Sequence, residues 1–598
     1  MKRALLDAQA RAAGIILEPR WGGAPPVPDT TKEALIAAFA HGEAAEGLGA
    51  AAAPSAALPQ TAYVPPFLNQ HKAFGVALQL YQLRSARNLG IGDLADLRAL
   101  ITPFAREGAD FIGLNPLHAL FTAAPERASP FSPSDRRFLN PLIVAVEDVP
   151  GYRPQMRASV HVPAADDAVD YTAAARAKLA ILRQIHGLWR AGSPDVPVQA
   201  VQAAARHRSE GGAPLEDFCL FEALSHAMVG DGRGAGWMDW PVQYQDRESA
   251  AVRAFREAHA SEVAFHAFLQ YIATEQLRAT QQAAREAGMR IGLYLDLAVG
   301  TAPDGASTWA DPELVVRGIR VGAPPDLFTS EGQDWGLAPL SPTVLRARDY
   351  TPYRDVLSAV MANAGATRID HAMGIERLFL IPDGVPATEG AYVAMPGLTD
   401  VLVEMTRRHE AIAIGEDLGV VPEGFRDRMG ARRIFAMRIV AFERDGVLMR
   451  APARYPADSL ACLSTHDLAP LEAWWRGDEI DIRVAVAGLS RGDAHLARLA
   501  RAEEKTLMVG LAGLPPTAAS RPLDDDLVVA LHKVVARSSS RMVAVRLEDV
   551  VGGRRLVNLP GTDREHPNWR NTLPITVDAV ARSERLARVF AAMREARP

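Results

Sequence analysis

Three acidic residues stand in short motifs that each follow a run of apolar residues. Asp370 lies in TRIDHAMG, Glu416 in IGEDLG, and Asp467 ends STHD. A carboxylate just past the end of a buried strand is fixed by the scaffold yet exposed in a loop, which is how (β/α) barrels build their active sites. Two carboxyl groups roughly 5–5.5 Å apart cleave an acetal with retention, one as acid and the other as nucleophile. The motifs therefore predict acid–base and nucleophilic work on a neutral, polyhydroxylated substrate.

The neighbours of Asp370 and Glu416 indicate how two such carboxyl groups would be prepared for their work. Arg368 precedes Asp370 by two residues in an extended segment, so both side chains can lie on the same face. A cation in that place keeps Asp370 ionised and directs it. Glu416 is followed by Asp417, and a like charge or partial burial raises a carboxyl pKa towards the range that a general acid needs at neutral pH.

Each of these residues also has an ordinary structural explanation. An isolated Asp or Glu after a strand is most often a helix cap or a member of a surface ion pair. His371 and His466 stand beside Asp370 and Asp467, where they could be no more than structural hydrogen-bond donors. Three acids in the same setting make coincidence less frequent, but residue types and spacing alone leave both explanations open.

Short apolar runs of strand length are the elements that must position these acids. Eight such runs occur, at residues 74–80, 110–114, 291–297, 365–369, 411–415, 433–440, 459–463 and 541–547. Stretches rich in Ala, Arg and Glu with helical spacing lie between several of them, at 251–288, 398–409 and 525–537. Strands that alternate with helices form βα units and a parallel sheet. We therefore expect an α/β fold, a closed (β/α)8 TIM barrel.

The spacing of the runs predicts one interrupted domain with an extension before it. Residues 1–66 are rich in Ala, Pro and Gly and are read as an N-terminal extension of unknown role. Residues 67–598 form the expected catalytic barrel, with insertions near 142–290, 298–364 and 464–540. Insertions into barrel loops enlarge or cover the active-site face without disturbing the strands, so they account for the length of the chain.

Composition excludes several classes of protein. The chain has 598 residues, of which 48% are hydrophobic and 23% charged, and its formal net charge is -6. No signal-peptide core or apolar stretch of membrane-spanning length is present, and basic residues form no stripe, so we expect neither a membrane nor a nucleic acid as partner. Cys219 and Cys462 are far apart, which fits a cytoplasmic protein. Acetal chemistry by carboxylates needs no Lewis acid, so we expect no cofactor and no metal.

Several longer motifs support a family resemblance. They are LRSARNLGIGDLADL (83–97), SPFSPSDRRFLNPL (129–142), VGAPPDLFTSEGQDWG (321–336), RIDHAMGIERLFLIP (368–382), GEDLG (415–419), STHD (464–467) and NLPGTDREHPNWR (558–570). With these motifs the chain resembles the 4-alpha-glucanotransferases, known as amylomaltases or disproportionating enzymes, of glycoside hydrolase family 77 in the alpha-amylase clan. The resemblance covers about residues 70–575.

The resemblance implies a role for each motif residue. Asp370 would be the nucleophile, Glu416 the general acid/base, and Asp467 the carboxylate that holds sugar hydroxyls and favours the distorted ring of the transition state. The implied substrate-binding residues are Arg368, His371, His466, Asp326, Gln333, Trp335, Asn568 and Asp296, with Trp335 as a stacking surface for a sugar face. Asp296 matches a recurrent position of the clan, where a structural role is equally expected.

The implied reaction is disproportionation of an alpha-1,4-glucan through a covalent glycosyl-enzyme. The donor would be a maltooligosaccharide or a starch- or glycogen-type glucan, and the acceptor glucose or a maltooligosaccharide. A retaining alpha-1,4-glucan hydrolase with the same three acids is the alternative of the same class, and the loop at 321–336 disfavours it. The alternative of another class is a non-catalytic glucan-binding protein. The presence of all three acids argues against it, because binding alone would not require a nucleophile and an acid/base pair.

Overall fold

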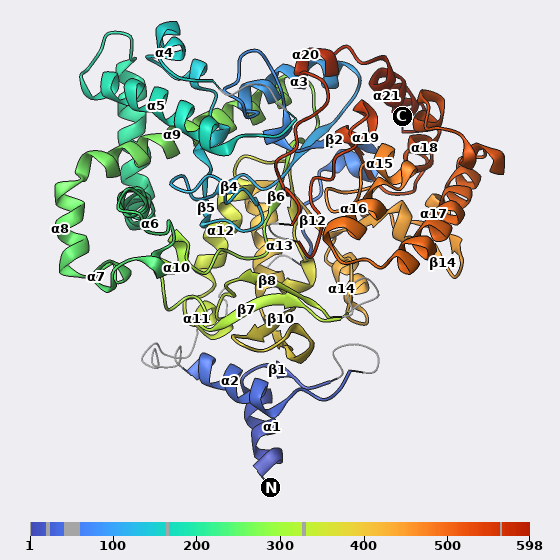
Figure 1. The fold of residues 1–598 in the computed structure, drawn as a ribbon, viewed down its shortest axis with the longest axis horizontal. Helices are drawn as coiled ribbons and strands as arrows, with labels where there is room; N and C mark the ends of the chain where they lie inside the picture. The colour runs from blue at the N-terminus through green and yellow to red at the C-terminus, as the bar shows by residue number, and fades with distance from the viewer. Residues whose placement is uncertain are drawn as a thin grey trace.

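The computed structural model describes residues 2–18, 24–40, 60–162, 167–325, 331–562 and 565–597. At its centre lies a closed barrel of parallel strands (Figure 1). Within the described residues it consists of β2 (Ala73–Leu78), β3 (Phe111–Leu114), β6 (Gly292–Leu297), β9 (Ala366–Ile369), β12 (Ile412–Gly415), β13 (Phe435–Ile439), β16 (Ser459–Cys462) and β17 (Met542–Arg546). Neighbouring strands follow one another in chain order, and β17 pairs with β2. The predicted (β/α)8 barrel is confirmed, and each barrel strand overlaps one of the eight predicted runs.

Small residues on the strands let aromatic side chains fill the barrel interior. A Cβ atom added at Gly75 would lie 2.3 Å from the carbonyl oxygen of Phe111, and one added at Gly113 would lie 2.7 Å from the ring of Tyr294. The rings of Phe111 and Tyr294 meet edge to face, with centroids 6.0 Å apart. Both side chains are buried, so this part of the barrel is a packed core and not a channel.

Helices cover the outside of the barrel, and the connections between strands differ greatly in length. The β3–β6 connection contains α4 (Pro154–Ala158), α5 (Tyr171–Arg190), α6 (Val198–Gly230), α7 (Val242–Gln245), α8 (Ala250–Ala258) and α9 (Ala260–Glu286). The β16–β17 connection contains α15 (Leu471–Arg476), α16 (Asp478–Val486), α17 (Arg491–Leu511) and α18 (Asp525–Ala536), and α19 (Leu547–Val551), α20 (Val577–Val580) and α21 (Glu584–Ala596) follow β17. The two groups lie on opposite sides of the barrel in Figure 1.

The remaining connections are shorter. They contain the helices α3 (Leu94–Arg106), α10 (Ala306–Ala310), α11 (Pro342–Ala347), α12 (Thr351–Met361), α13 (Leu398–His409) and α14 (Phe425–Ala431). Two small antiparallel ladders join β4 (His118–Ala119) to β5 (Asp135–Leu139) and β14 (Arg444–Asp445) to β15 (Leu448–Met449).

A second, antiparallel sheet stands beside the barrel. Its strands are β7 (Ile319–Ala323), β8 (Gln333–Leu337), β10 (Arg377–Pro382), β11 (Ala391–Ala394) and β1 (Ile15–Ile16), in the order β1-β11-β10-β7-β8. The short 3-10 helix η7 (Ala372–Ile375) connects the residues after β9 to β10. This sheet is therefore joined directly to the segment that carries Asp370.

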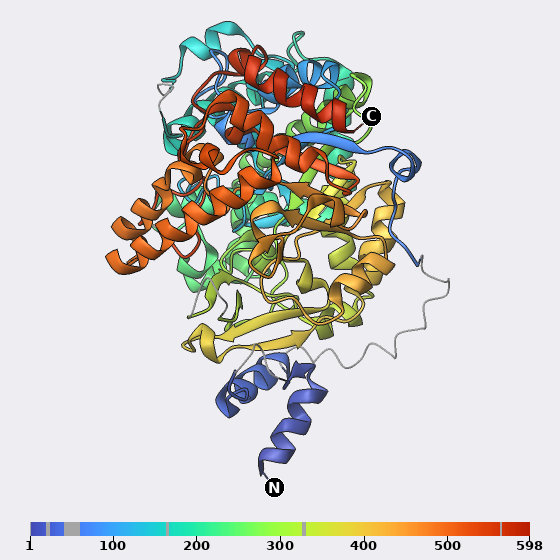
Figure 2. The ribbon, with the colours of Figure 1, turned by 90° about the vertical axis from the view of Figure 1, so that its right-hand side faces the viewer.

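The first residues of the chain dock on this second sheet. Helices α1 (Lys2–Ala12) and α2 (Asp29–Ala40) lie below it in Figures 1 and 2, and β1 adds an edge strand to β11. The hydroxyl of Thr31 donates a hydrogen bond of 3.0 Å to the carbonyl of Glu389. Ile15 and Leu35 are buried and belong to the same apolar core as the barrel helices. This segment is thus packed on the molecule.

Two further features concern the prediction of location. In the described part of the chain no helix combines the length and the apolar character that crossing a bilayer requires. Cys219 and Cys462 are both buried and form no disulfide.

Candidate active site

The predicted acids lie past the carboxyl ends of three barrel strands. Asp370 directly follows β9, Glu416 directly follows β12, and Asp467 lies in the turn after β16. Strands β9 and β12 are neighbours, and the backbone amide of Glu416 donates a hydrogen bond of 3.0 Å to the carbonyl of Ile369. Since all carboxyl ends of a parallel barrel meet on one face, the three acids share one end of the barrel.

Arg368 lies on β9, two residues before Asp370, and its guanidinium binds the Asp370 carboxylate. Its Nη1 atom lies 2.8 Å from Asp370 Oδ1 and 2.9 and 3.0 Å from the two carboxylate oxygens of Asp296, which sits opposite it on β6. Burial opposes the charge of Arg368, but Asp296, Asp370 and Glu416 outweigh burial and keep the guanidinium pKa well above its ordinary value. Asp296 is buried, so its role in this geometry is to hold Arg368.

Glu416 is surrounded in a different way. Its carboxylate accepts hydrogen bonds from the backbone amides of His371, at 3.0 Å, and Leu418, at 2.8 Å. Burial raises its pKa from 4.5 to about 7 and the charge of Asp370 adds to this, while Arg368 and the two amides oppose the rise. A carboxyl group with a pKa near neutrality is suited to give and take a proton.

Asp467 is held by two side chains that lie close to it in space. Asn558 Nδ2 donates a hydrogen bond of 2.9 Å to Asp467 Oδ1, and His466 Nε2 lies 3.2 Å from Asp467 Oδ2. Burial would raise the carboxyl pKa, but His466 and Asn558 outweigh it and hold the pKa well below the ordinary range. Asp467 is therefore an anion at neutral pH, and 42% of its side chain remains exposed to a ligand.

His371 and the strand β8 form another wall of the site. His371 has left-handed backbone angles, φ 46° and ψ 62°, and burial lowers the pKa of its imidazole to about 4. Its Nε2 atom is buried without a hydrogen-bond partner among the described residues. The indole of Trp335 meets the imidazole edge to face at 5.0 Å, and Trp335 Nε1 donates to Gln333 Oε1 at 3.1 Å. Trp335 and Gln333 thus lie beside the segment that carries Asp370 and His371.

Two other predicted binding residues are placed differently. Asp326 lies outside the described residues. Asn568 uses its side chain inside its own loop, where Oδ1 accepts a hydrogen bond of 2.9 Å from the amide of Leu559. Its Nδ2 atom donates to the carbonyl and hydroxyl oxygens of Thr562 at 3.0 and 3.1 Å. In this geometry Asn568 fixes the loop that begins near Asn558.

Sequence reasoning missed two residues of the site. Asn558 holds Asp467, and the ring of Phe131 stacks on the imidazole of His466 with centroids 5.0 Å apart. Both residues lie inside motifs that carried the family resemblance, which was the available signal. Their contacts join segments remote in sequence, so spacing along the chain could not reveal them.

A cavity lies beneath these residues at the axis of the barrel. Its volume is about 60 Å³, and it is lined by Asp296, Arg368 and His466 together with the interior residues Ala77, Gly113, Tyr294, Met437, Leu460, Cys462 and Ala544. Gln79 and Arg546 also reach it. The site is therefore a polar depression on top of the apolar core.

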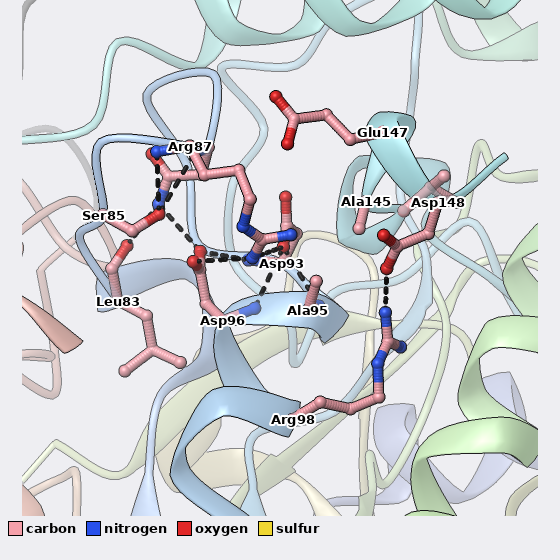
Figure 3. A network of polar contacts seen from close by, with 12 residues as sticks. Leu83, Ser85, Arg87, Asp93, Ala95, Asp96, Arg98, Ala145, Glu147 and Asp148 are labelled. Carbon is pink, nitrogen blue, oxygen red and sulfur yellow. Dashed lines mark hydrogen bonds and ion pairs between the residues drawn. The ribbon is translucent and has the colours of Figure 1, made fainter. Parts of the chain in front are cut away.

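The motif at 83–97 has a structural function in this fold (Figure 3). Asp93 and Asp96 form a capping box at the start of α3. Arg87 Nη2 and Asn88 Nδ2 donate to the carboxylate of Asp96 at 3.2 and 2.8 Å, and the buried Lys178 lies 3.4 Å from Asp93. This network fixes the loop between β2 and α3 at the same end of the barrel as the acids.

The barrel and its three carboxylates define a class, the (β/α)8-barrel enzymes that act on glycosidic bonds. Residues 78–576 match the family described as 4-alpha-glucanotransferase. Curated 4-alpha-glucanotransferases of Haemophilus influenzae and Mycobacterium tuberculosis are each 34% identical to the chain, over 90% and 89% of it and over 81% and 76% of their own lengths. The chain therefore belongs to the 4-alpha-glucanotransferase family and is an enzyme of that activity, so the resemblance seen in its motifs is confirmed.

Solved structures agree on the fold. The amylomaltase of Corynebacterium glutamicum superposes with a TM-score of 0.83 at 24% identity and covers 99% of both chains. An amylomaltase of Streptococcus agalactiae, solved in complex with acarbose, superposes with a TM-score of 0.72 at 18% identity, over 88% of this chain and 99% of its own. The barrel together with its insertions is thus shared across low sequence identity.

Proposed function

We propose that Asp370 and Glu416 carry out glucan transfer by double displacement. The observation that supports this most strongly is the difference between their surroundings. Asp370 is bonded to a buried guanidinium, whereas Glu416 is held by backbone amides and has a pKa of about 7. Two neighbouring carboxyl groups in opposite environments divide the roles of nucleophile and acid/base between them.

The first half-reaction breaks the donor. Glu416 gives its proton to the glycosidic oxygen while Asp370 Oδ attacks the anomeric carbon, so the C–O bond to the reducing-end fragment breaks and a glycosyl ester forms. Asp467, an anion at neutral pH, accepts hydrogen bonds from hydroxyls of the same sugar and faces the positive charge that develops on the ring. In the second half-reaction Glu416 takes the proton of the acceptor's 4-hydroxyl, the oxygen attacks the anomeric carbon, and Asp370 leaves.

The proposed donor is a maltooligosaccharide or a starch- or glycogen-type glucan, and the proposed acceptor is glucose or a maltooligosaccharide. Trp335 offers a flat apolar surface next to His371, which suits the apolar face of a glucose unit. The Streptococcus agalactiae amylomaltase was solved in complex with acarbose, which supports a saccharide ligand for this chain. We propose the remaining predicted residues, Arg368, His371, His466, Gln333 and Asp296, as the lining of the same subsite or its support.

Water competes with the acceptor for the glycosyl ester, and the outcome distinguishes transfer from hydrolysis. We propose incubating the purified protein with maltotriose and following all products by chromatography. Glucose together with chains longer than maltotriose supports transfer. Glucose and maltose without longer chains would instead identify a hydrolase, and an unchanged substrate would favour a binding protein.

A pair of matched variants tests the role of Asp370. Asp370→Asn keeps the size of the side chain but removes the nucleophile, so we expect turnover to fall at least about 10⁴-fold while glucan binding persists. Asp349→Asn is the control, because its carboxylate is exposed and, among the described residues, is ion-paired only with Arg354. Turnover of Asp370→Asn at the rate of the control would refute the mechanism.

A further inference from the structure

None of the three acids follows β17, the last strand of the barrel, but the side chain of Arg546 on this strand is hydrogen-bonded to the turn that contains Asp467. Arg546 is the final residue of β17 and is 4% exposed. Its Nη1 atom donates hydrogen bonds to the carbonyl oxygens of Thr465, at 2.6 Å, and Leu468, at 2.9 Å. These two carbonyls flank His466 and Asp467 on either side. A single guanidinium nitrogen thus bridges the turn beneath the two residues.

Asp549, three residues later in α19, binds the ends of the same turn. Its carboxylate accepts a hydrogen bond of 2.7 Å from the hydroxyl of Ser464 and one of 2.8 Å from the backbone amide of Leu471. Arg546 Nη1 also reaches Ser464 Oγ at 3.3 Å. The backbone contacts of Arg546 lie inside the turn and those of Asp549 at its two ends, so together the two side chains span residues 464–471.

The charged side chains of Arg546 and of its neighbours Glu548 and Asp549 are deeply buried. Asp549 is 1% exposed and Glu548, whose Oε2 atom lies 3.5 Å from Arg546 Nε, is 2% exposed. Burying an ion pair costs desolvation energy that apolar residues of the same volume would not require. A group of buried charges at this position is therefore expected to serve geometry more than stability. Arg546 also lines the cavity under the site, beside Arg368 and His466.

We propose that Arg546, assisted by Asp549, is a positioning residue that sets the orientation of Asp467 and His466. This inference rests on the proposed function of Asp467 as a ligand of the reacting sugar. Arg546 fixes the carbonyl that precedes His466 and the carbonyl of Leu468, the residue after Asp467, so loss of its hydrogen bonds lets the turn rotate. A displacement of about 1 Å at a catalytic group costs on the order of 10²-fold in rate.

The test uses two buried arginines with the same chemistry at opposite ends of the barrel. Arg597 also donates to backbone carbonyls, those of Ala73, Ala536 and Ser540, and lies where the barrel strands begin. We expect Arg546→Lys to lower kcat about 10²-fold with a smaller change in KM. We expect Arg597→Lys to lower the thermal midpoint and leave kcat of the folded protein within about twofold. Equal kcat in the two variants would overturn the proposal.

A double-mutant cycle separates positioning of Asp467 from general damage. If Arg546 acts through Asp467, the change Arg546→Lys in an Asp467→Asn background should reduce the residual rate by less than about threefold. A full additional loss of about 10²-fold would show that Arg546 acts by another route and would overturn the proposal. Should Arg546→Lys not fold, Ser464→Ala replaces it in both experiments with the same expected signs.

Failure of this inference is distinguishable from failure of the proposed function. If the wild-type protein makes no longer chains from maltotriose, or Asp467→Asn retains the wild-type rate, the proposed function or the role of Asp467 is wrong. If both behave as expected and Arg546→Lys does not differ from Arg597→Lys, only the positioning role is wrong.

Discussion

Asp370 and Glu416 follow the ends of the neighbouring strands β9 and β12, but the two carboxyl groups have different hydrogen-bond partners. Arg368 donates a hydrogen bond to Asp370, whereas the hydrogen-bond donors to the Glu416 carboxylate within the described residues are backbone amides, and this carboxylate is buried. The consequence is a carboxyl group whose pKa is raised to about 7. About half of Glu416 is then protonated near pH 7, which the proposed role of general acid requires before substrate binds.

This pKa predicts the pH dependence of donor cleavage. In the proposed mechanism the first half-reaction requires protonated Glu416, so kcat/KM for maltotriose should fall as pH rises through about 7. Initial rates between roughly pH 5 and 9 provide the measurement. His371→Asn is the control, because burial already lowers the pKa of His371 to about 4 and asparagine tolerates its left-handed backbone. Disappearance of the alkaline limb in that variant would assign it to His371 instead.

The same shift predicts an effect on stability. The folded-state pKa of Glu416 lies above its ordinary value, so the folded protein binds this proton more tightly, and stability falls as pH rises from about 4.5 to about 7. Glu416→Gln removes the charge that burial disfavours. We expect this variant to be inactive and to gain thermal midpoint relative to wild type at pH 8 but not at pH 4. Calorimetry at both pH values checks the sign, and an equal difference at the two would contradict it.

At the level of elements, the barrel and the second sheet are joined by the segment that follows Asp370. Asp370 follows β9, and the chain enters β10 a few residues later. In the second sheet β10 pairs with β7, and β7 pairs with β8, which contains Gln333 and Trp335. The β7–β8 ladder is close at Gly322, where an added Cβ atom would lie 2.1 Å from the carbonyl oxygen of Gln333. The position of Trp335 over the site therefore depends on a residue without a side chain.

Gly322→Ala tests this dependence. The methyl group must push β8 away from β7, so we expect KM for maltotriose to rise about tenfold or more, with a small change in the thermal midpoint. Gly187→Ala is the control, because Gly187 lies inside α5 and an added Cβ atom would meet nothing within 4 Å. The control should keep its KM and gain a little stability, about 0.5–1 kcal/mol. Steady-state kinetics of both variants decides the matter.

The secondary-structure elements also show which parts of the fold could be predicted from the sequence. Each barrel strand is a short apolar run bounded by turn signals, because both its faces are buried, and this pattern located all eight strands. The second sheet was not predicted. Two of its pairings, β1 with β11 and β7 with β10, join segments far apart in the chain, such as Ile15 with Val393, so spacing along the sequence does not show that its local pairs β7–β8 and β10–β11 belong to one sheet. The three acids could be proposed from their place after strands. Asn558, Phe131 and Arg546 could not, because their contacts with the Asp467 turn exist only in three dimensions.

For the whole molecule, closure of the barrel depends on the end of the chain as well as on β17. Arg597 is buried and donates to the carbonyls of Ala73, where β2 begins, and of Ala536 and Ser540, which precede β17. The side chain thus joins the start of β2 to the segment that leads from α18 into β17. It lies at the opposite end of the barrel from the acids, so its contribution belongs to stability.

Arg597→Met should therefore destabilise the fold without altering the site. Carbonyls that lose a cationic donor are left buried, and a loss of about 3 kcal/mol in the free energy of unfolding is expected. Arg594→Met is the matched control, because Arg594 is half-exposed and its ion pair with Glu107 is at the surface. Denaturant titration followed by circular dichroism measures the difference. Equal midpoints for the two variants would contradict the closing role of Arg597.

The docking of β1 has a consequence for how the protein is made. Strand β1 pairs with β11, which begins at Ala391, 375 residues after Ile16. Strand β2 likewise pairs with β17, which begins only at Met542. At about 5–20 residues per second, ribosomal synthesis needs on the order of 20–75 s before β1 can pair. The buried Ile15 is exposed throughout that interval. Strand β1 therefore stays unpaired during that interval, and nascent chains that stall between residues 16 and 391 expose an unpaired strand edge that can associate with other chains.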